Sequence, residues 1–165
     1  MLLGSRRITF LGLLLSVAVL LILAGNYIEP GTLFFLSAAS FCIGIALRET
    51  DMRLGFGFWV AATLTGFILS PNKLYVFTFS AMGIYVLLSE LAFDKIALST
   101  KIENKKKVLW LAKYFIFNWL YLPTLLIFPE LLISKKLNFW VWMIAFLAGQ
   151  GFLWIYDRAY LYFQG

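Results

Sequence analysis

Glu90, Asp94 and Lys113 are the charged side chains whose positions beside apolar runs suggest chemistry. Together they could serve a lipid-modifying enzyme at the membrane face. Membrane enzymes that transfer phospho-alcohols hold metal ions with several acidic residues in one helix, whereas this segment offers only Glu90 and Asp94. Glu90 and Lys113 lie at similar depth in consecutive apolar segments, so we predict that they approach one another as a structural ion pair. A proton or ion relay is the alternative.

Other catalytic arrangements are missing from the composition. The chain has no His, which excludes Ser–His hydrolysis, HExxH zinc chemistry and haem ligation by imidazole. Its single cysteine, Cys42, excludes a thiol redox pair and a cysteine zinc site. No glycine-rich phosphate-binding motif is present, since Gly55 and Gly57 open an apolar segment instead. We therefore expect no enzymatic activity, no cofactor and no metal site.

The composition indicates that lipid is the natural solvent. Of the 165 residues, 62% are hydrophobic, 19% are aromatic and only 13% are charged. A soluble domain of this size could not keep so much apolar surface from water. The net charge of +6 comes mostly from short loops, where basic residues set the orientation in a membrane, so nucleic acid is not an expected partner.

The stretch 54–90 is the part around which the other elements are arranged. Two apolar runs are separated only by Ser70-Pro71-Asn72-Lys73, a turn too short for anything except reversing the chain. Each run, at ~1.5 Å per residue, can cross most of a ~30 Å hydrocarbon layer. The stretch is therefore predicted to be a transmembrane helical hairpin.

Further apolar runs on both sides of the hairpin predict an all-α integral membrane protein with six transmembrane helices in one compact bundle. Pro123 should kink the fifth helix. One domain, residues 1–160, is expected, and residues 161–165 resemble a protease-cleavage scar left by an expression vector. The six helices are expected over residues 8–24, 32–47, 54–70, 73–93, 108–132 and 137–156.

Six spans place both termini on one side of the membrane, and the basic residues identify that side. Only Lys73, Lys135 and Lys136 lie on the other side. Because Lys and Arg accumulate in cytoplasmic loops, both termini of this multi-pass cell-membrane protein are predicted to be cytoplasmic. The basic residues on the N-terminal side are Arg6, Arg7, Arg48, Arg53, Lys95, Lys101, Lys105, Lys106, Lys107, Lys113 and Arg158.

Small residues four apart are candidates for helix contacts, because helices in lipid associate where their backbones approach closely. Such spacing also arises by chance in a chain rich in Gly and Ala. The pairs are Gly12/Ser16, Ser40/Gly44, Ala62/Gly66 and Ala145/Gly149.

Polar residues of the outer loops, together with one residue within the fifth helix, are the candidate ligand-binding groups. A small polar ligand arriving from outside would meet the loop residues first. The alternative is that they are the polar ends of helices, and that Asn118 and Gln150 make hydrogen bonds between helices. The candidates are Asn26, Tyr27, Glu29, Asn72, Lys73, Tyr75, Asn118, Glu130 and Asn138.

Two local segments and the overall layout of the helices resemble those of a known family of membrane proteins. Pro30-Gly31-Thr32-Leu33 enters the second helix, and Leu69-Ser70-Pro71-Asn72-Lys73-Leu74 precedes Gly83-Ile84-Tyr85 on the fourth. With six short helices, these segments resemble the substrate-binding S components of energy-coupling-factor vitamin transporters. The resemblance implies capture of a vitamin or similar micronutrient at the outer face, for uptake with a separate transmembrane coupling subunit and a pair of ATPases. That family docks through alanines four apart on its first helix, where this chain has Gly12 and Ser16.

A non-transport structural or assembly protein, packing against a larger complex, is the alternative to a binding subunit. The two differ in the interior that they predict. A binding subunit should enclose an outer cavity lined by Trp or Tyr with a few polar groups, whereas an assembly protein should be filled there. The enzyme alternative would place its cavity on the inner side near Glu90. The lipid bilayer is a partner in every case.

Overall fold

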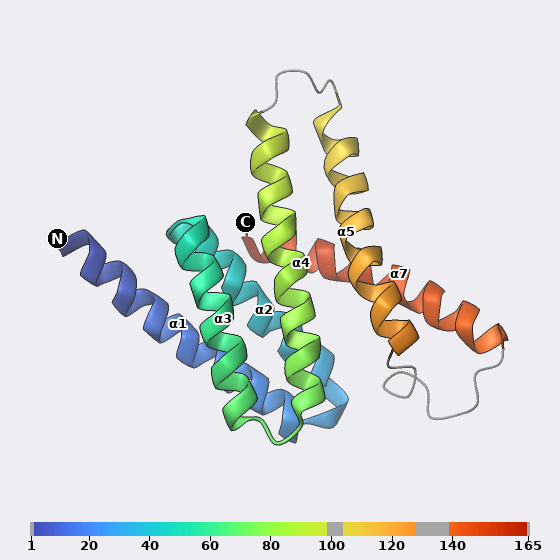
Figure 1. Cartoon of the computed structure of the whole chain (residues 1–165), viewed down its shortest axis with the longest axis horizontal. Coiled ribbons are helices and arrows are strands. Elements are labelled where there is room, and N and C mark those ends of the chain that lie inside the picture. The colour runs from blue at the N-terminus through green and yellow to red at the C-terminus, as the bar shows by residue number, and fades with distance from the viewer. Residues whose placement is uncertain (1, 99–103, 128–138, 165) are drawn as a thin grey trace. The chain divides into compact units, whose positions relative to one another are not determined.

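The computed structural model describes residues 2–98, 104–127 and 139–164, and nearly all of them are helical. The prediction of an all-α chain is confirmed for these residues. A short 3₁₀ helix, η1 (Glu29–Gly31), joins the first two long helices (Figure 1). The long helices are α1 (Leu2–Tyr27), α2 (Thr32–Glu49), α3 (Met52–Leu69), α4 (Lys73–Leu98), α5 (Lys105–Ile127) and α7 (Phe139–Gln164).

Some helices begin at the predicted turn residues, whereas others extend beyond the apolar runs from which they were predicted. α2 begins at Thr32 and α4 at Lys73, as predicted, because Pro30-Gly31 and Pro71 interrupt the preceding helices. α4 continues to Leu98, beyond its predicted end at residue 93. α5 passes through Pro123 and reaches Ile127, while its predicted end at residue 132 lies outside the described residues. α7 continues through the suspected scar to Gln164.

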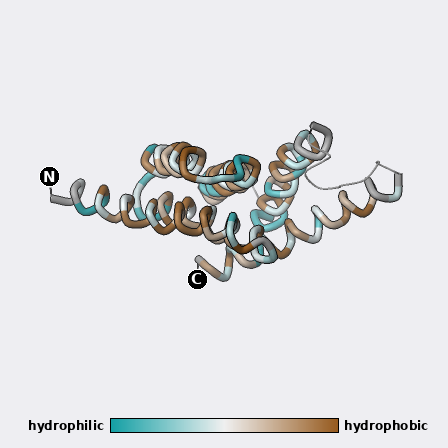
Figure 2. The backbone as a smooth tube through the Cα atoms, turned by 90° about the horizontal axis from the view of Figure 1, so that it is seen from below, coloured by the Kyte–Doolittle hydropathy of each residue, from teal (hydrophilic) through white to brown (hydrophobic). Residues whose placement is uncertain are grey.

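Four helices in the described residues are long and apolar enough to cross a membrane: residues Arg6–Tyr27 of α1, and α2, α3 and α4. Large apolar side chains on their surfaces are exposed, including Leu20 at 65%, Phe34 at 72% and Ile68 at 77%. Burying such a side chain is worth roughly 1.5–3 kcal/mol in water, so this surface is suited to lipid. In Figure 2 the hydrophobic colour recurs along α1 after a hydrophilic turn near its N-terminal end.

Contacts group the chain into two compact units, residues 1–91 and 92–165, where the sequence predicts one bundle. In the first unit α1, α2 and α3 contact one another. The largest of the fully buried apolar side chains in the interior of this unit come from α1, α2 and α4. They are Ile22, Leu36, Ile43, Val76, Phe79 and Val86.

Gly83 of α4 allows three helices of the first unit to meet. A Cβ atom at this position would lie 2.6 Å from Cδ1 of Trp59 on α3 and 2.7 Å from Cδ1 of Ile43 on α2. The indole Nε1 of Trp59 also donates a hydrogen bond to the backbone oxygen of Ser80, 3.3 Å away. The missing side chain at Gly83 therefore makes room for the Trp59 ring.

Three of the four small-residue pairs have buried members, and the fourth is exposed. Gly66 faces Ile22 and Val76, and Gly149 faces the ring of Tyr121. A Cβ atom at Gly12 would meet nothing within 4 Å. Of the eight residues, Ser40, Gly44, Ala62, Gly66 and Gly149 are buried, Ala145 is half-buried, and Gly12 and Ser16 are exposed.

Candidate functional site

The predicted ligand-binding residues of the first unit gather where α1 ends and α3 turns into α4 (Figure 1). Asn26, Ser70, Asn72 and Lys73 are joined there by hydrogen bonds, and we call them the Asn26 cluster. Three of these four residues are sequence-predicted candidates, and Ser70 completes the group. The short Pro71 turn brings α3 and α4 to the last turn of α1.

Asn26 holds the turn through its side-chain amide. Its Oδ1 accepts hydrogen bonds from Oγ of Ser70 at 3.0 Å and from the backbone N–H of Asn72 at 3.1 Å. Its Nδ2 donates to the backbone oxygen of Ile22, 2.8 Å away. An amide oxygen accepts about two hydrogen bonds, so Oδ1 is fully used. Asn26 therefore fastens α1 to the α3–α4 turn.

Asn72 and Lys73 provide hydrogen-bond partners for backbone groups at the ends of α4 and α3. Oδ1 of Asn72 accepts from the N–H of Leu74, 3.0 Å away, at the start of α4. Nζ of Lys73 donates to the backbone oxygen of Ser70 at 2.9 Å and also to that of Phe67. The same ammonium group lies 5.0 Å from the centre of the Phe67 ring. The last carbonyl groups of a helix lack hydrogen-bond partners within it. The ammonium group of Lys73 donates hydrogen bonds to such carbonyl groups at the C-terminal end of α3.

The remaining candidates are placed in different ways. Tyr27 is 78% exposed and Tyr75 is half-buried. Glu29 belongs to η1. Asn118 belongs to α5 in the second unit, and Glu130 and Asn138 lie outside the described residues. The structure thus brings together Asn26, Asn72 and Lys73, whereas the side chain of Tyr27 is exposed.

Replacing Asn26 by Ala should destabilise the chain by about 1–3 kcal/mol, because the N–H of Asn72 would lose its acceptor in a partly buried place, while Ser70 Oγ would keep only the backbone oxygen of Asn72. Thermal unfolding in detergent measures this effect. Thr78→Ala is the control, since Oγ1 of Thr78 makes only a local bond to the backbone oxygen of Leu74. Equal losses in the two variants would contradict the role given to Asn26.

The second unit contains an ion pair between its two helices. Nζ of Lys113 on α5 lies 2.6 Å from Oδ1 of Asp157 on α7, and the two side chains are only 10% and 13% exposed. Direct pairing of opposite charges lowers the cost of keeping either of them away from water. Asp157 is therefore the group that allows Lys113 to lie within α5.

Further polar contacts continue the same interface, and we call them with the ion pair the α5–α7 polar row. Nε2 of Gln150 donates to Oδ1 of Asn118, 2.9 Å away. The hydroxyl of Tyr121 donates to the backbone oxygen of Ala145, 2.7 Å away. Asn118 follows Lys113 by five residues and Gln150 precedes Asp157 by seven, so both contacts fit one antiparallel pairing. A hydrogen bond between helices, the alternative to a ligand-binding role for Asn118, is present.

Glu90 also has a partner within its own unit. Its Oε1 lies 3.2 Å from Nη2 of Arg48 on α2, with the Arg48 side chain 44% exposed and the Glu90 side chain 12% exposed. The contact predicted between Glu90 and Lys113 would join the two units, and it stays a prediction. Within the units, Glu90 contacts Arg48 and Lys113 contacts Asp157.

Sequence analysis did not identify Arg48 and Asp157 as partners. The signal for Asp157 was present, because Gln150 and Asp157 are two helical turns apart and share one face of α7. Lys113 and Asn118 are five residues apart in α5, which places them in successive turns but not in one row along the helix. Matching the polar residues of the two helices in antiparallel order would have paired Asp157 with Lys113. No comparable spacing singles out Arg48.

A shallow hollow of about 470 Å³ lies on the surface of α5. Lys106, Lys107, Trp110 and Leu111 line it. These residues lie in the first two turns of α5, where Lys105, Lys106 and Lys107 begin the helix.

Comparisons with known proteins add no family. No protein-family model matches the chain, and searches of curated proteins and of solved structures find no match. The resemblance to S components therefore stays a prediction that rests on the residues and the helix layout of this chain.

Proposed function

We propose that the chain is a six-span protein of the cell membrane, with its helices in one bundle and both termini in the cytoplasm. It captures a small micronutrient from outside, for uptake with separate coupling and ATPase subunits. This function needs no catalytic residue. Binding energy at the outer face, followed by reorientation when the partner hydrolyses ATP, is sufficient.

The observation that carries the proposal is the gathering of the Asn26 cluster at the end of the first unit that is poor in Lys and Arg. Asn26 at the end of α1 accepts a hydrogen bond from the backbone N–H of Asn72, 46 residues further along, and Lys73 follows Asn72 directly. Tyr27 and Tyr75 lie near them in sequence and offer aromatic surface to a ligand. A ligand that bonds to the amide of Asn26 would replace Ser70 or the N–H of Asn72.

The exposed pair on α1 supports docking to a coupling subunit. Gly12 has open space where a Cβ atom would be, and Ser16 is exposed, with its hydroxyl bonded to the backbone oxygen of Gly12 at 3.0 Å. The resemblance assigns docking to this position of the first helix. Small residues there leave the backbone accessible to a partner helix.

The α5–α7 polar row supports a count of six spans. α5 has 23 residues and α7 has 26, which is enough to cross the hydrocarbon layer. Their charged and amide side chains are paired with each other in Lys113–Asp157 and Asn118–Gln150. Pairing is how polar groups are accommodated within lipid.

A structural or assembly role is the second candidate, and the hydrogen bonding of the Asn26 cluster favours it. Both acceptor positions of Asn26 Oδ1 are taken within the chain, and Lys73 is bonded to the end of α3. Beneath the cluster, Ile22 and Val76 are buried. A protein that only packs against other proteins needs no space for a ligand, so a fully hydrogen-bonded end above buried side chains suits that role.

Native mass spectrometry of the detergent-purified protein separates the two candidates. Capture predicts a non-covalently bound small molecule whose occupancy falls in Tyr27→Ala and Lys73→Gln, with Arg53→Gln at the basic end as the control. It also predicts that a membrane subunit and ATPases co-purify, and that Gly12→Leu removes them. Recovery of protein partners without any small molecule, and without ATPases, would contradict capture and support the structural role.

A further inference from the structure

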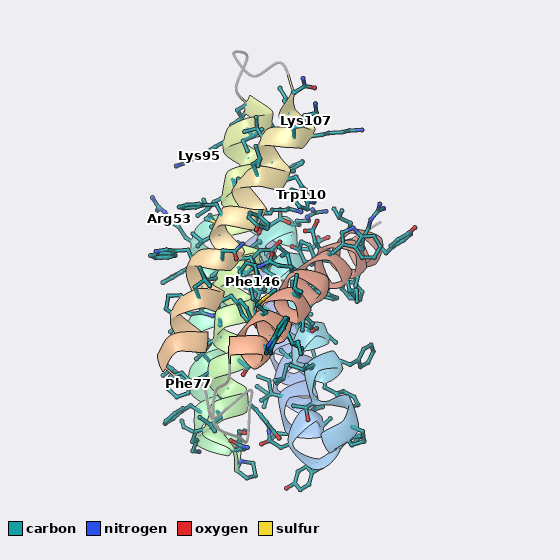
Figure 3. The ribbon with its side chains drawn as sticks, turned by 90° about the vertical axis from the view of Figure 1, so that its right-hand side faces the viewer. Arg53, Phe77, Lys95, Lys107, Trp110 and Phe146 are labelled. Carbon is teal, nitrogen blue, oxygen red and sulfur yellow. The ribbon has the colours of Figure 1, made fainter. Side chains whose placement is uncertain are left out.

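The hollow on α5 combines positive charge with apolar surface in a definite order. Lys106 and Lys107 are exposed, and Trp110 and Leu111 are 52% and 62% exposed. Figure 3 shows the labelled side chains of Lys107 and Trp110 on α5. Positions i, i+1, i+4 and i+5 lie on one side of a helix, so all four side chains border the same hollow. The surface of the hollow is almost entirely apolar, and the two lysines border it with their aliphatic stems while carrying their charges beside it.

The two lysines are available to a ligand. Lys105 is engaged, because its Nζ donates to the backbone oxygen of Ala97 at 2.7 Å. Within the part of the chain that the structure describes, Lys106 and Lys107 have neither an ion pair nor a hydrogen bond from their ammonium groups. Two unpaired positive charges next to each other attract an anion.

The order of side chains along α5 follows the layers of a membrane leaflet. The rings of Trp110 and Tyr114 stack at 5.7 Å with an interplanar angle of 14°. Phe115, 73% exposed, and Trp119, 65% exposed, continue the apolar surface. At ~1.5 Å per residue, Lys106 and Tyr114 are about 12 Å apart along the helix. Lysines thus precede amphipathic rings, and apolar side chains follow, as at a membrane interface.

We propose that the hollow bordered by Lys106, Lys107, Trp110 and Leu111 binds an anionic phospholipid. The two ammonium groups hold the phosphate, and the aromatic and aliphatic side chains of the next turns lie along the acyl chains. Charge complementarity selects an acidic lipid, and the exposed apolar surface below the lysines requires an occupant with a tail. The proposal is independent of micronutrient capture, because it concerns the basic end of the second unit alone.

Native mass spectrometry after exposure to equal amounts of phosphatidylglycerol and phosphatidylcholine tests the site. The unaltered protein should retain phosphatidylglycerol preferentially, and the double variant Lys106→Gln/Lys107→Gln should bind it at least about tenfold more weakly. Trp110→Ala should also lower retention, although it keeps every charge. The charge-matched control, Arg6→Gln/Arg7→Gln at the start of α1, should retain the lipid.

Three results would overturn the proposal. Equal losses in the two double variants would indicate diffuse attraction to positive charge without a site. Equal retention of both lipids by the unaltered protein would remove the role of the phosphate charge. Displacement of the lipid by soluble glycerol phosphate would indicate a site for free phosphate groups. Thermal unfolding of every variant in detergent confirms that the fold is retained, since Lys106 and Lys107 are exposed.

Discussion

Gly55→Ala should destabilise the protein by about 1–3 kcal/mol, because the added methyl group has no room at the contact between α2 and α3. A Cβ atom at Gly55 would collide with Cδ2 of Leu47, would lie 2.6 Å from its Cγ and would lie 3.2 Å from its Cα. A side chain can rotate away, but the contact with Leu47 Cα requires α2 itself to move. The midpoint of thermal unfolding in detergent should fall accordingly.

The matched control is two residues along the same helix. A Cβ atom at Gly57 would meet nothing within 4 Å, so Gly57→Ala should be neutral or stabilising by up to about 1 kcal/mol through helix propensity. Leu47→Ala combined with Gly55→Ala should lose less stability than the sum of the single changes, because the smaller side chain at 47 relieves part of the collision. Equal effects of the changes at 55 and 57 would refute the close approach of α2 and α3.

Lys113→Met should cost about 3–5 kcal/mol of stability, since it leaves the largely buried carboxylate of Asp157 without the Lys113 ammonium group. Asp157→Leu should have a similar effect for the same reason. The double variant Lys113→Met/Asp157→Leu should be clearly more stable than the sum of the two losses predicts, because it removes both charges together. Unfolding in detergent measures all three variants.

The ion pair between Arg48 and Glu90 provides the comparison. Since the Arg48 side chain is 44% exposed, Arg48→Met and Glu90→Gln should each cost no more than about 1 kcal/mol. Additive losses for Lys113→Met and Asp157→Leu would show that these two groups do not interact. Coupling between Glu90→Gln and Lys113→Met would instead support the contact predicted across the units.

The helical hairpin of residues 54–90 could be predicted because its signals are local. Pro71 stops one helix, and Asn72 begins the next by accepting the N–H of Leu74. The observed end of α3 at Leu69 and the start of α4 at Lys73 follow from these few residues. Length and apolar composition then suffice to make each arm a candidate span.

The pairing of side chains between helices could not be predicted in the same way. In a soluble protein the polar face of a helix shows which side points to solvent and which side packs against the core. A helix surrounded by lipid is apolar on nearly every side, so this information is missing. Gly55 and Gly57 look alike in sequence, although one is buried against Leu47 and the other is exposed. Lys113 was recognised as a group that needs a partner, whereas Asp157, 44 residues away, depends on how α5 and α7 are aligned.

The hydrogen bonds of Lys73 to the end of α3 have a consequence for biosynthesis. A chain entering a bilayer must bring the tip of each hairpin through a layer that offers neither donors nor acceptors. In α3 and α4 the tip supplies its own partners, with the lysine bonded to carbonyls at the end of α3 and Asn72 bonded to the N–H of Leu74 in the first turn of α4. The two arms are thus prepared to insert together, and α1, which is synthesised before them, can then bind the turn through Asn26.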